Sequence, residues 1–154
     1  MSDDSEGFGQ SGQDLRSRRH EAKHAQTYAL FLKHFCERSG LPRERSEKAL
    51  VSVLCALEQR LLQPAADDLR AQLPMKLQEA LRACAPQRER SPRTFSVDEL
   101  LQKVAEDLGE DTTRAESVTR AVFATVRAHV TEGEAEQVAH ALPADLRAFW
   151  ARPI

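Results

Sequence analysis

Residues that build strands, staple small folds or cross membranes are scarce in this chain. Its 154 residues include 6 Gly, 7 Pro and 3 Cys, and aromatic residues make up 5% of the total. No stretch approaches the roughly 20 apolar residues of a membrane-spanning helix, and residues 1–13 lack the apolar run of a secretory signal. Val and Ile form no run with the two-residue period of a strand, so we predict no strand. We therefore expect no membrane segment and no β-sheet.

An excess of charge of one sign is also missing. The chain has 22 basic and 24 acidic residues, for a net charge of -2, whereas a protein that coats DNA would be strongly basic. We therefore do not expect nucleic acid as its main partner. Cys36, Cys55 and Cys84 are too widely spaced for a zinc pattern or a disulfide framework, which favours a reducing, cytoplasmic location. We expect Cys36 and Cys55 to be small core side chains.

Helix-forming residues dominate what remains. Ala, Leu, Arg, Glu and Gln are abundant, and all five have high helix propensity. Hydrophobic residues make up 41% and charged residues 30% of the chain, a composition typical of a soluble globular protein. The sequence therefore predicts an all-α fold.

The chain also repeats itself with a period of about 69 residues. Residues 27–85 align with residues 96–154 without a gap, and apolar positions coincide nearly throughout. The clearest matches are Leu73-Pro74-x-x-Leu77 with Leu142-Pro143-x-x-Leu146, and Arg45-x-Glu47 with Arg114-x-Glu116. Because chance would not keep that register over some sixty positions, we interpret the chain as a tandem repeat.

Each copy is predicted to form four helices, since start and stop signals recur within it. In the second copy these signals are Ser96 with Glu99 as a capping box, Gly109 as a helix end, a second helix near Thr113 with Glu116 as its capping partner, Thr131 with Glu134, and Pro143 as the first residue of the fourth helix. We predict a polar extension over residues 1–25 (disordered at first and helical toward its end), repeat one over 26–85, a linker over 86–94 and repeat two over 95–154. One copy alone would be marginally stable. We therefore predict that the two copies pack as one body with a pseudo-twofold axis.

This pattern resembles a known family. A helix rich in Tyr, Phe and Leu ends in Ser39-Gly40-Leu41, a third helix leads to Gln72-Leu73-Pro74-Met75, and a corresponding Ala141-Leu142-Pro143-Ala144 precedes Phe149-Trp150. From Gln26 to Trp150 the chain is similar to the bacterial family catalogued as domain of unknown function 2267. The resemblance implies a helical fold and supplies no activity, cofactor or catalytic residue.

One short motif points to an enzyme. His20-Glu21-Ala22-Lys23-His24 matches H-E-x-x-H, in which two His one helical turn apart bind zinc and the Glu acts as a base. Such peptidases also need a third ligand and a sheet edge to hold the substrate, and we predict no strand. We therefore interpret the motif as the exposed start of a helix, and a small zinc hydrolase using His20, Glu21 and His24 stays the alternative.

The other polar candidates have structural interpretations. His34 and His129 align with Lys103 and Arg60, which indicates solvent-facing positions, and His140 is no stronger a ligand candidate. Asp67 and Asp68 lie in a first helical turn, where the helix dipole favours acids. For Arg45-x-Glu47 and Arg114-x-Glu116 we favour a capping and bridging role between helices over a paired polar binding site.

We therefore assign no catalytic, cofactor-binding or metal-binding residue, and the sequence points away from an enzyme without deciding the matter. The leading hypothesis is a non-enzymatic interaction or scaffold module in the bacterial cytoplasm, with an unknown protein partner or self-association. We expect any binding surface at the seam between the copies or near Phe149 and Trp150, although these aromatics favour the core. A basic strip makes weak nucleic-acid binding a further alternative. The strip consists of Arg16, Arg18, Arg19, Lys23, Arg88, Arg90 and Arg93.

Overall fold

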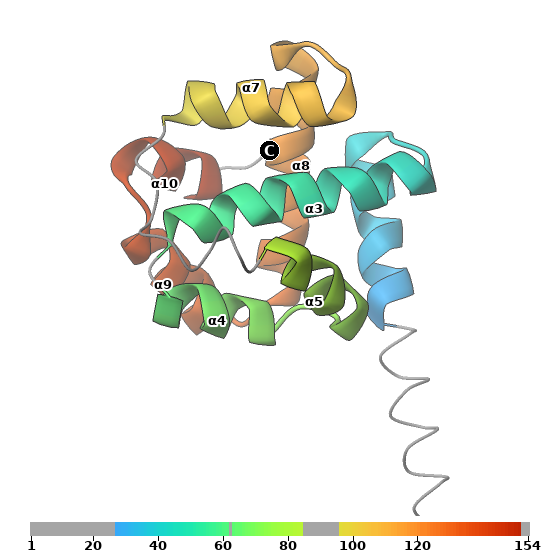
Figure 1. The fold of residues 1–154 in the computed structure, drawn as a ribbon. Helices are drawn as coiled ribbons and strands as arrows, with labels where there is room; N and C mark the ends of the chain where they lie inside the picture. Colours follow the sequence, from blue (N-terminus) through green and yellow to red (C-terminus); the bar gives the residue numbers. More distant parts are fainter. Residues whose placement is uncertain (1–26, 62, 85–95, 152–154) are drawn as a thin grey trace, which may run out of the picture.

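A computed structural model of the chain describes residues 27–61, 63–84 and 96–151, and these residues are helical, with no strand among them (Figure 1). The first helix occupies residues 27–39. The others are α3 (Arg43–Arg60), α4 (Gln63–Ala71), α5 (Met75–Leu81), the short 3-10 helix η1 (Arg82–Cys84), α7 (Val97–Leu108), α8 (Thr112–His129), α9 (Glu132–Ala141) and α10 (Ala144–Ala151). The predicted all-α class is confirmed. In the part of the chain that is described, no helix has the length and hydrophobicity to span a membrane.

Helix boundaries in the two halves coincide when the numbering is shifted by 69. The longest helices, α3 and α8, have 18 residues each and start at positions 43 and 112. Gly40 and Gly109 end the helices that precede them, with φ of 72° and 66°. Only glycine adopts this left-handed conformation at little cost, so both positions are natural helix ends.

Most of the capping interactions that the sequence predicts are present in the structure. Ser96 and Glu99 form the predicted capping box, and the Thr131 hydroxyl accepts from the Glu134 N–H at 3.1 Å. The N–H of Thr131 donates instead to Gln72 Oε1 at 2.9 Å, which joins α9 to the end of the first half. Two details differ from the expectation. Asp111 rather than Thr113 caps the start of α8, and its side chain accepts from the Arg114 N–H. Pro143 precedes the first residue of α10.

Both Leu-Pro steps are held by the same kind of contact. A carbonyl before a proline at a helix end has no intrahelical partner. In the first half, Gln78 Nε2 donates to the carbonyl of Leu73 at 2.8 Å. In the second, Arg147 Nη2 donates to the carbonyl of Leu142 at 2.9 Å. A side chain one turn into the next helix therefore closes each step.

A single hydrophobic core contains residues of both halves. Its largest fully buried aromatic side chains are Phe31, Phe35, Phe123 and Trp150. Phe123 meets Trp150 edge to face at 5.6 Å between ring centroids, and the indole N–H donates to the carbonyl of Ala135 at 2.9 Å. Helix α3 crosses in front of α8 in Figure 1, and α4 lies beside α9. Matching helices from the two halves therefore share one interior.

Two arginines join the halves through backbone carbonyls. Arg45 Nη2 donates to the carbonyl of Leu108, the last residue of α7, at 2.7 Å. Arg114 Nη2 donates to the carbonyl of Ser39, the last helical residue before Gly40, at 3.0 Å. Both arginines come from the Arg-x-Glu motif, and the predicted bridging role is confirmed for them. The motif's glutamates pair instead along their own helices, Glu47 with Arg43 and Glu116 with Arg120.

Replacing Arg114 with Ala should lower the free energy of unfolding by about 1–2 kcal/mol, because a charge-assisted hydrogen bond to a helix end is lost. Urea denaturation followed by circular dichroism measures the change. Arg43→Ala is the matched control, since the Arg43 side chain is 71% exposed and its pair with Glu47 spans 3.7 Å. Equal stabilities of the two variants would contradict the bridging role.

Candidate functional site

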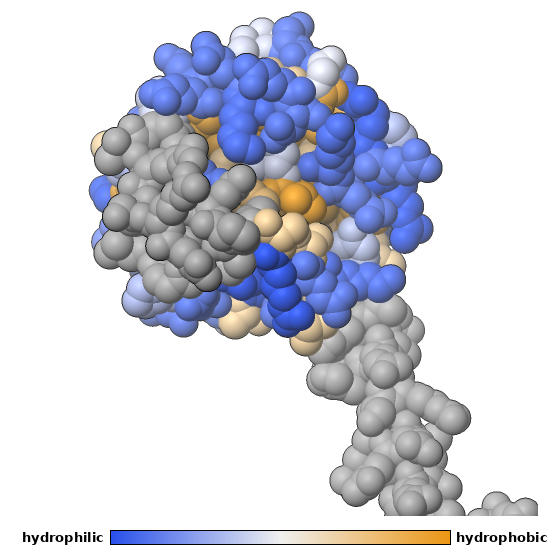
Figure 2. Space-filling view, in the orientation of Figure 1, coloured by the Kyte–Doolittle hydropathy of each residue, from blue (hydrophilic) through white to orange (hydrophobic). Residues whose placement is uncertain are grey.

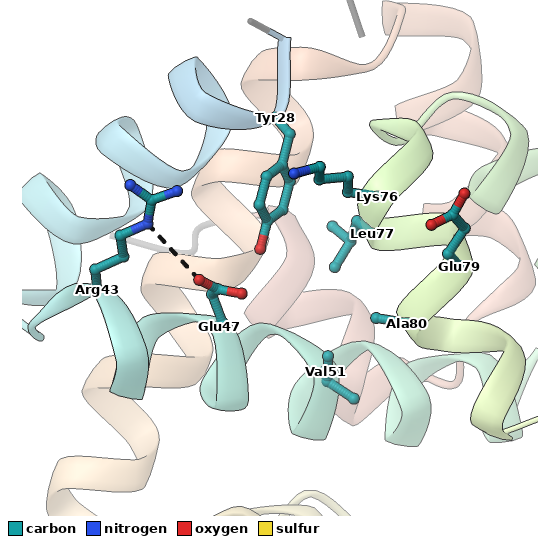
Figure 3. A pocket seen from close by; sticks show the side chains of 8 residues that line it. All are labelled: Tyr28, Arg43, Glu47, Val51, Lys76, Leu77, Glu79 and Ala80. Atoms are coloured by element: carbon teal, nitrogen blue, oxygen red, sulfur yellow. Dashed lines mark ion pairs between the residues drawn. The ribbon is translucent and has the colours of Figure 1, made fainter. Parts of the chain in front are cut away.

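A concave surface lies where residues 27–39, α3 and α5 meet. Figure 3 shows this hollow, of about 450 Å³, with Tyr28 and Glu47 reaching into it from different helices. Charged groups of both signs stand at its rim. Its lining consists of Tyr28, Arg43, Glu47, Val51, Lys76, Leu77, Glu79 and Ala80. The hollow therefore combines an apolar floor with paired charges.

Tyr28 is the most buried polar group of this hollow, with 8% of its surface exposed. Burial, followed by the negative charge of Glu47 and hydrogen bonding to it, raises the pKa of Tyr28 to about 12. The phenol is therefore protonated at neutral pH and serves as a hydrogen-bond donor rather than as a base or nucleophile.

A second hollow of about 530 Å³ adjoins the first. It lies between α3 and α7 and is lined by Glu47, Lys48, Val51, Ser52 and Asp107. Glu47 and Val51 line both hollows, and we call the combined surface the α3 groove. Figure 2 shows hydrophobic residues at the centre of this face, surrounded by hydrophilic ones. The α3 groove thus includes residues from both halves of the chain.

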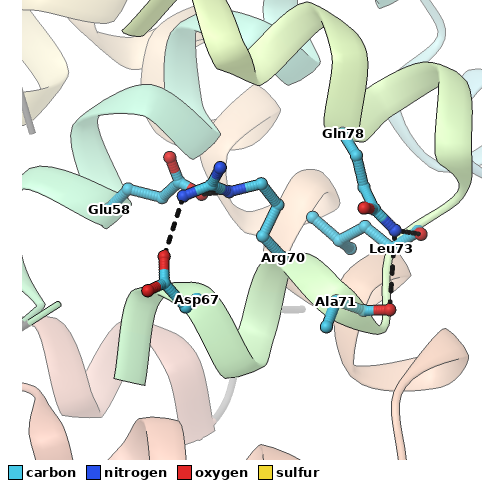
Figure 4. Close-up of polar contacts among 6 residues, drawn as sticks. All are labelled: Glu58, Asp67, Arg70, Ala71, Leu73 and Gln78. Atoms are coloured by element: carbon cyan, nitrogen blue, oxygen red, sulfur yellow. Dashed lines mark hydrogen bonds and ion pairs between the residues drawn. The ribbon is translucent and has the colours of Figure 1, made fainter. Parts of the chain in front are cut away.

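A buried ion pair lies at the other end of α3 (Figure 4). Arg70 of α4 reaches Glu58 through Nε at 3.1 Å and Asp67 through Nη2 at 3.1 Å. The Glu58 side chain is only 2% exposed. Burial raises the pKa of Glu58 to about 7, and the adjacent Arg70 opposes part of that rise. Asp67 is thus one acid of a structural ion-pair network, and Asp68 beside it is exposed.

Two histidines that the sequence analysis places in solvent are half-buried instead. His34 Nδ1 and His129 Nε2 lie 3.1 Å apart and connect residues 27–39 with α8. The prediction of solvent-facing positions is wrong for both, because the two helices pack against each other at that point. His140 is exposed, with Nδ1 2.8 Å from the carbonyl oxygen of Glu136. In the described part of the chain, no group of three or more His, Cys, Asp or Glu is arranged to hold a metal ion.

The cysteine prediction needs a correction. Cys55 is disulfide-bonded, whereas Cys36 is a free thiol whose Sγ donates to Ser46 Oγ at 3.2 Å. The side chain of Cys84 lies outside the described residues. Spacing along the chain did not reveal the disulfide, since sequence separation says little about distance between helices. Disulfides persist in oxidising surroundings. The cysteines therefore no longer favour a reducing, cytoplasmic location.

The C-terminal aromatics divide between core and surface. Trp150 is fully buried, as its place in the hydrophobic pattern favours. Phe149 is half-buried, and the guanidinium of Arg120 lies 4.1 Å from the centre of its ring. The zinc motif (His20, Glu21 and His24) and the whole basic strip lie outside the described residues. The structure therefore tests neither alternative.

The sequence analysis singles out Glu47 and Leu77 but misses the other residues that line the α3 groove. Tyr28 was assigned to the hydrophobic face of its helix, and Lys76 and Val51 carried no motif at all. The one available signal was a polar phenol at a core position whose counterpart in the second half is Val97. That signal is weak, because tyrosine often packs in cores with its hydroxyl at the edge.

Comparison with family models now gives a direct result. Residues 28–149 match the model described as an uncharacterized conserved protein (DUF2267). The chain belongs to this family. The match spans both halves and both hollows of the α3 groove. It leaves out only residue 27 at the start of the first helix and residues 150–151 at the end of α10. No curated protein matches the chain. Membership confirms the resemblance and assigns no function.

Alkylation under denaturing but non-reducing conditions should label Cys36 and leave Cys55 unlabelled, because Cys36 has a free thiol and Cys55 is disulfide-bonded. Peptide mapping by mass spectrometry measures the labelling of each cysteine. A sample reduced first is the control, and all three cysteines should then react. Labelling of Cys55 without reduction would contradict the disulfide.

Replacing Glu58 with Gln should remove a pH dependence of stability. A carboxyl whose pKa is raised in the folded state makes its full contribution to stability below its pKa in the unfolded chain, about 4.5. This contribution is lost as the pH rises through about 7, the pKa in the folded protein. Relative to wild type, Glu58→Gln should therefore gain roughly 1–3 kcal/mol between pH 5 and pH 8. Urea denaturation at both pH values tests this, with the exposed Glu106→Gln as control. A constant difference between variant and wild type would refute the prediction.

Proposed function

We propose that this protein is a non-enzymatic interaction module that binds a protein segment in the α3 groove. The observation that carries the proposal is the composition of the groove. Val51, Leu77 and Ala80 form apolar contact area, and charged side chains of both signs surround it. Protein-binding grooves commonly combine an apolar centre with a polar rim, and a helix with an apolar face is a suitable occupant.

The electrostatics of the groove also favour binding over chemistry. Tyr28 holds its proton at neutral pH, and Glu47 is occupied by Arg43 at 3.7 Å. A nucleophile would need an adjacent base to activate it. The groups of the groove are suited to hydrogen bonds and ion pairs with a partner's side chains.

We further infer that the halves are the tandem four-helix units which the repeat predicts, related by a pseudo-twofold axis. Two observations support this inference. Helix boundaries recur at an offset of 69 residues. The contacts of Arg45 with Leu108 and of Arg114 with Ser39 are equivalent, because the two arginines differ by 69 positions and so do the two carbonyl residues. A bacterial, cytoplasmic setting remains a prediction, and the disulfide of Cys55 weakens the argument for the cytoplasm.

Replacing Val51 with Glu should abolish partner binding, because Val51 lies where the two hollows meet. The protein should stay folded, because Val51 is only half-buried. Light scattering measures self-association, and affinity capture with quantitative mass spectrometry measures retention of other proteins. Leu30→Glu is the matched control, since Leu30 is 48% exposed and is not a lining residue of the α3 groove. Circular dichroism verifies the fold of both variants.

A monomer that retains no protein would overturn the proposal. So would a partner retained equally by wild type and Val51→Glu. Loss of binding in Val51→Glu but not in Leu30→Glu is the expected result.

A further inference from the structure

His34 and His129 are the only pair of titratable rings in direct contact among the described residues. They lie 95 positions apart in the sequence, with Nδ1 of His34 3.1 Å from Nε2 of His129 and ring centroids 5.3 Å apart. Both side chains are half-buried. Phe31 packs against the other side of this contact, with its ring centroid 4.8 Å from that of His129.

The contact depends on the protonation state of both rings. A neutral imidazole has one N–H donor and one lone pair, so one ring can donate to the other. The same bond survives when the pair holds one extra proton. When both rings are protonated, each nitrogen carries a hydrogen and no acceptor remains. The hydrogen bond is then replaced by two like charges in direct contact.

The surroundings of His129 add positive charge to this contact. The charged and titratable groups that act on His129 are His34 and Arg38, both from residues 27–39. Arg38 Nη1 is held in place by Thr125 Oγ1 of α8 at 3.2 Å. Burial, then His34, then Arg38 lower the pKa of His129. The folded protein therefore resists protonation of this ring.

We propose that His34 and His129 form a pH-sensitive clasp between residues 27–39 and α8, closed at neutral pH and opened by protonation of both rings. The folded protein binds fewer protons at His129 than the unfolded chain does. The stabilising effect of the clasp is therefore complete above the ordinary histidine pKa of 6.5 and is lost as the pH falls. Tyr28 of the same helix lines the α3 groove, so opening of the clasp would reach that surface. The clasp itself does not require the groove to bind anything.

The test compares wild type, His34→Gln, His129→Gln and the double variant by urea denaturation at pH 8 and pH 5.5. Glutamine is polar and does not titrate. From pH 8 to pH 5.5, the folding equilibrium constant of wild type should fall about 2- to 12-fold more than that of His129→Gln. This is the factor that one hydrogen bond contributes. This pH-dependent difference should become smaller when His34 is already Gln, and the part that remains is due to burial and Arg38. All four proteins keep His20, His24 and the buried carboxyls, whose titration cancels.

The exposed His140→Gln is the matched control and should leave the pH dependence unchanged. If His129→Gln has the same effect with and without His34, burial alone accounts for the behaviour and the clasp is refuted. Should a glutamine variant fail to fold, NMR titration of the wild-type rings decides. Coupled rings lose their protons in two separated steps, whereas two independent single-site curves would overturn the proposal.

Discussion

Two arginines each cap the end of a helix that belongs to the opposite half of the chain. A helix C-terminus has carbonyls without intrahelical partners and a partial negative charge, which a guanidinium satisfies on both counts. Arg45 supplies this at Leu108 and Arg114 at Ser39, in each case just before a glycine in the left-handed conformation. A side chain built on Gly40 would lie 3.9 Å from Arg114 Nη2, within van der Waals contact. These contacts connect each half of the chain to a helix end in the other half.

The two halves share a single hydrophobic core. The core contains buried residues from residues 27–39, α3, α7 and α8 together, and small helical units of about 60 residues bury too little surface to be stable alone. The α3 groove follows from the same arrangement, because α7 contributes Asp107 to a surface otherwise formed by the first half. Only the hollow that includes Asp107 therefore depends on the docking of the two halves.

Buried and half-buried titratable groups of the folded protein respond to pH in opposite directions. Burial raises the pKa of Glu58 and of Glu134, with Asp68 adding to the rise at Glu134. Burial and nearby positive groups lower the pKa of His129. Oε2 of Glu134 has no hydrogen-bond partner in the described part of the chain, which accords with a carboxyl that favours its neutral form. Acid therefore stabilises the carboxyl sites and weakens the histidine contact.

The sequence by itself determined the helices, their ends and the two Leu-Pro steps, because periodicity, capping and proline geometry act over a few neighbouring residues. It also identified the bridging arginines, since a motif that recurs at a fixed offset signals a common role. Tertiary structure alone decided the histidine contact, the disulfide of Cys55, the burial of Glu58 and the composition of the α3 groove. These features join positions far apart in the chain. Their distances depend on how whole helices dock, and local sequence patterns carry no measure of that.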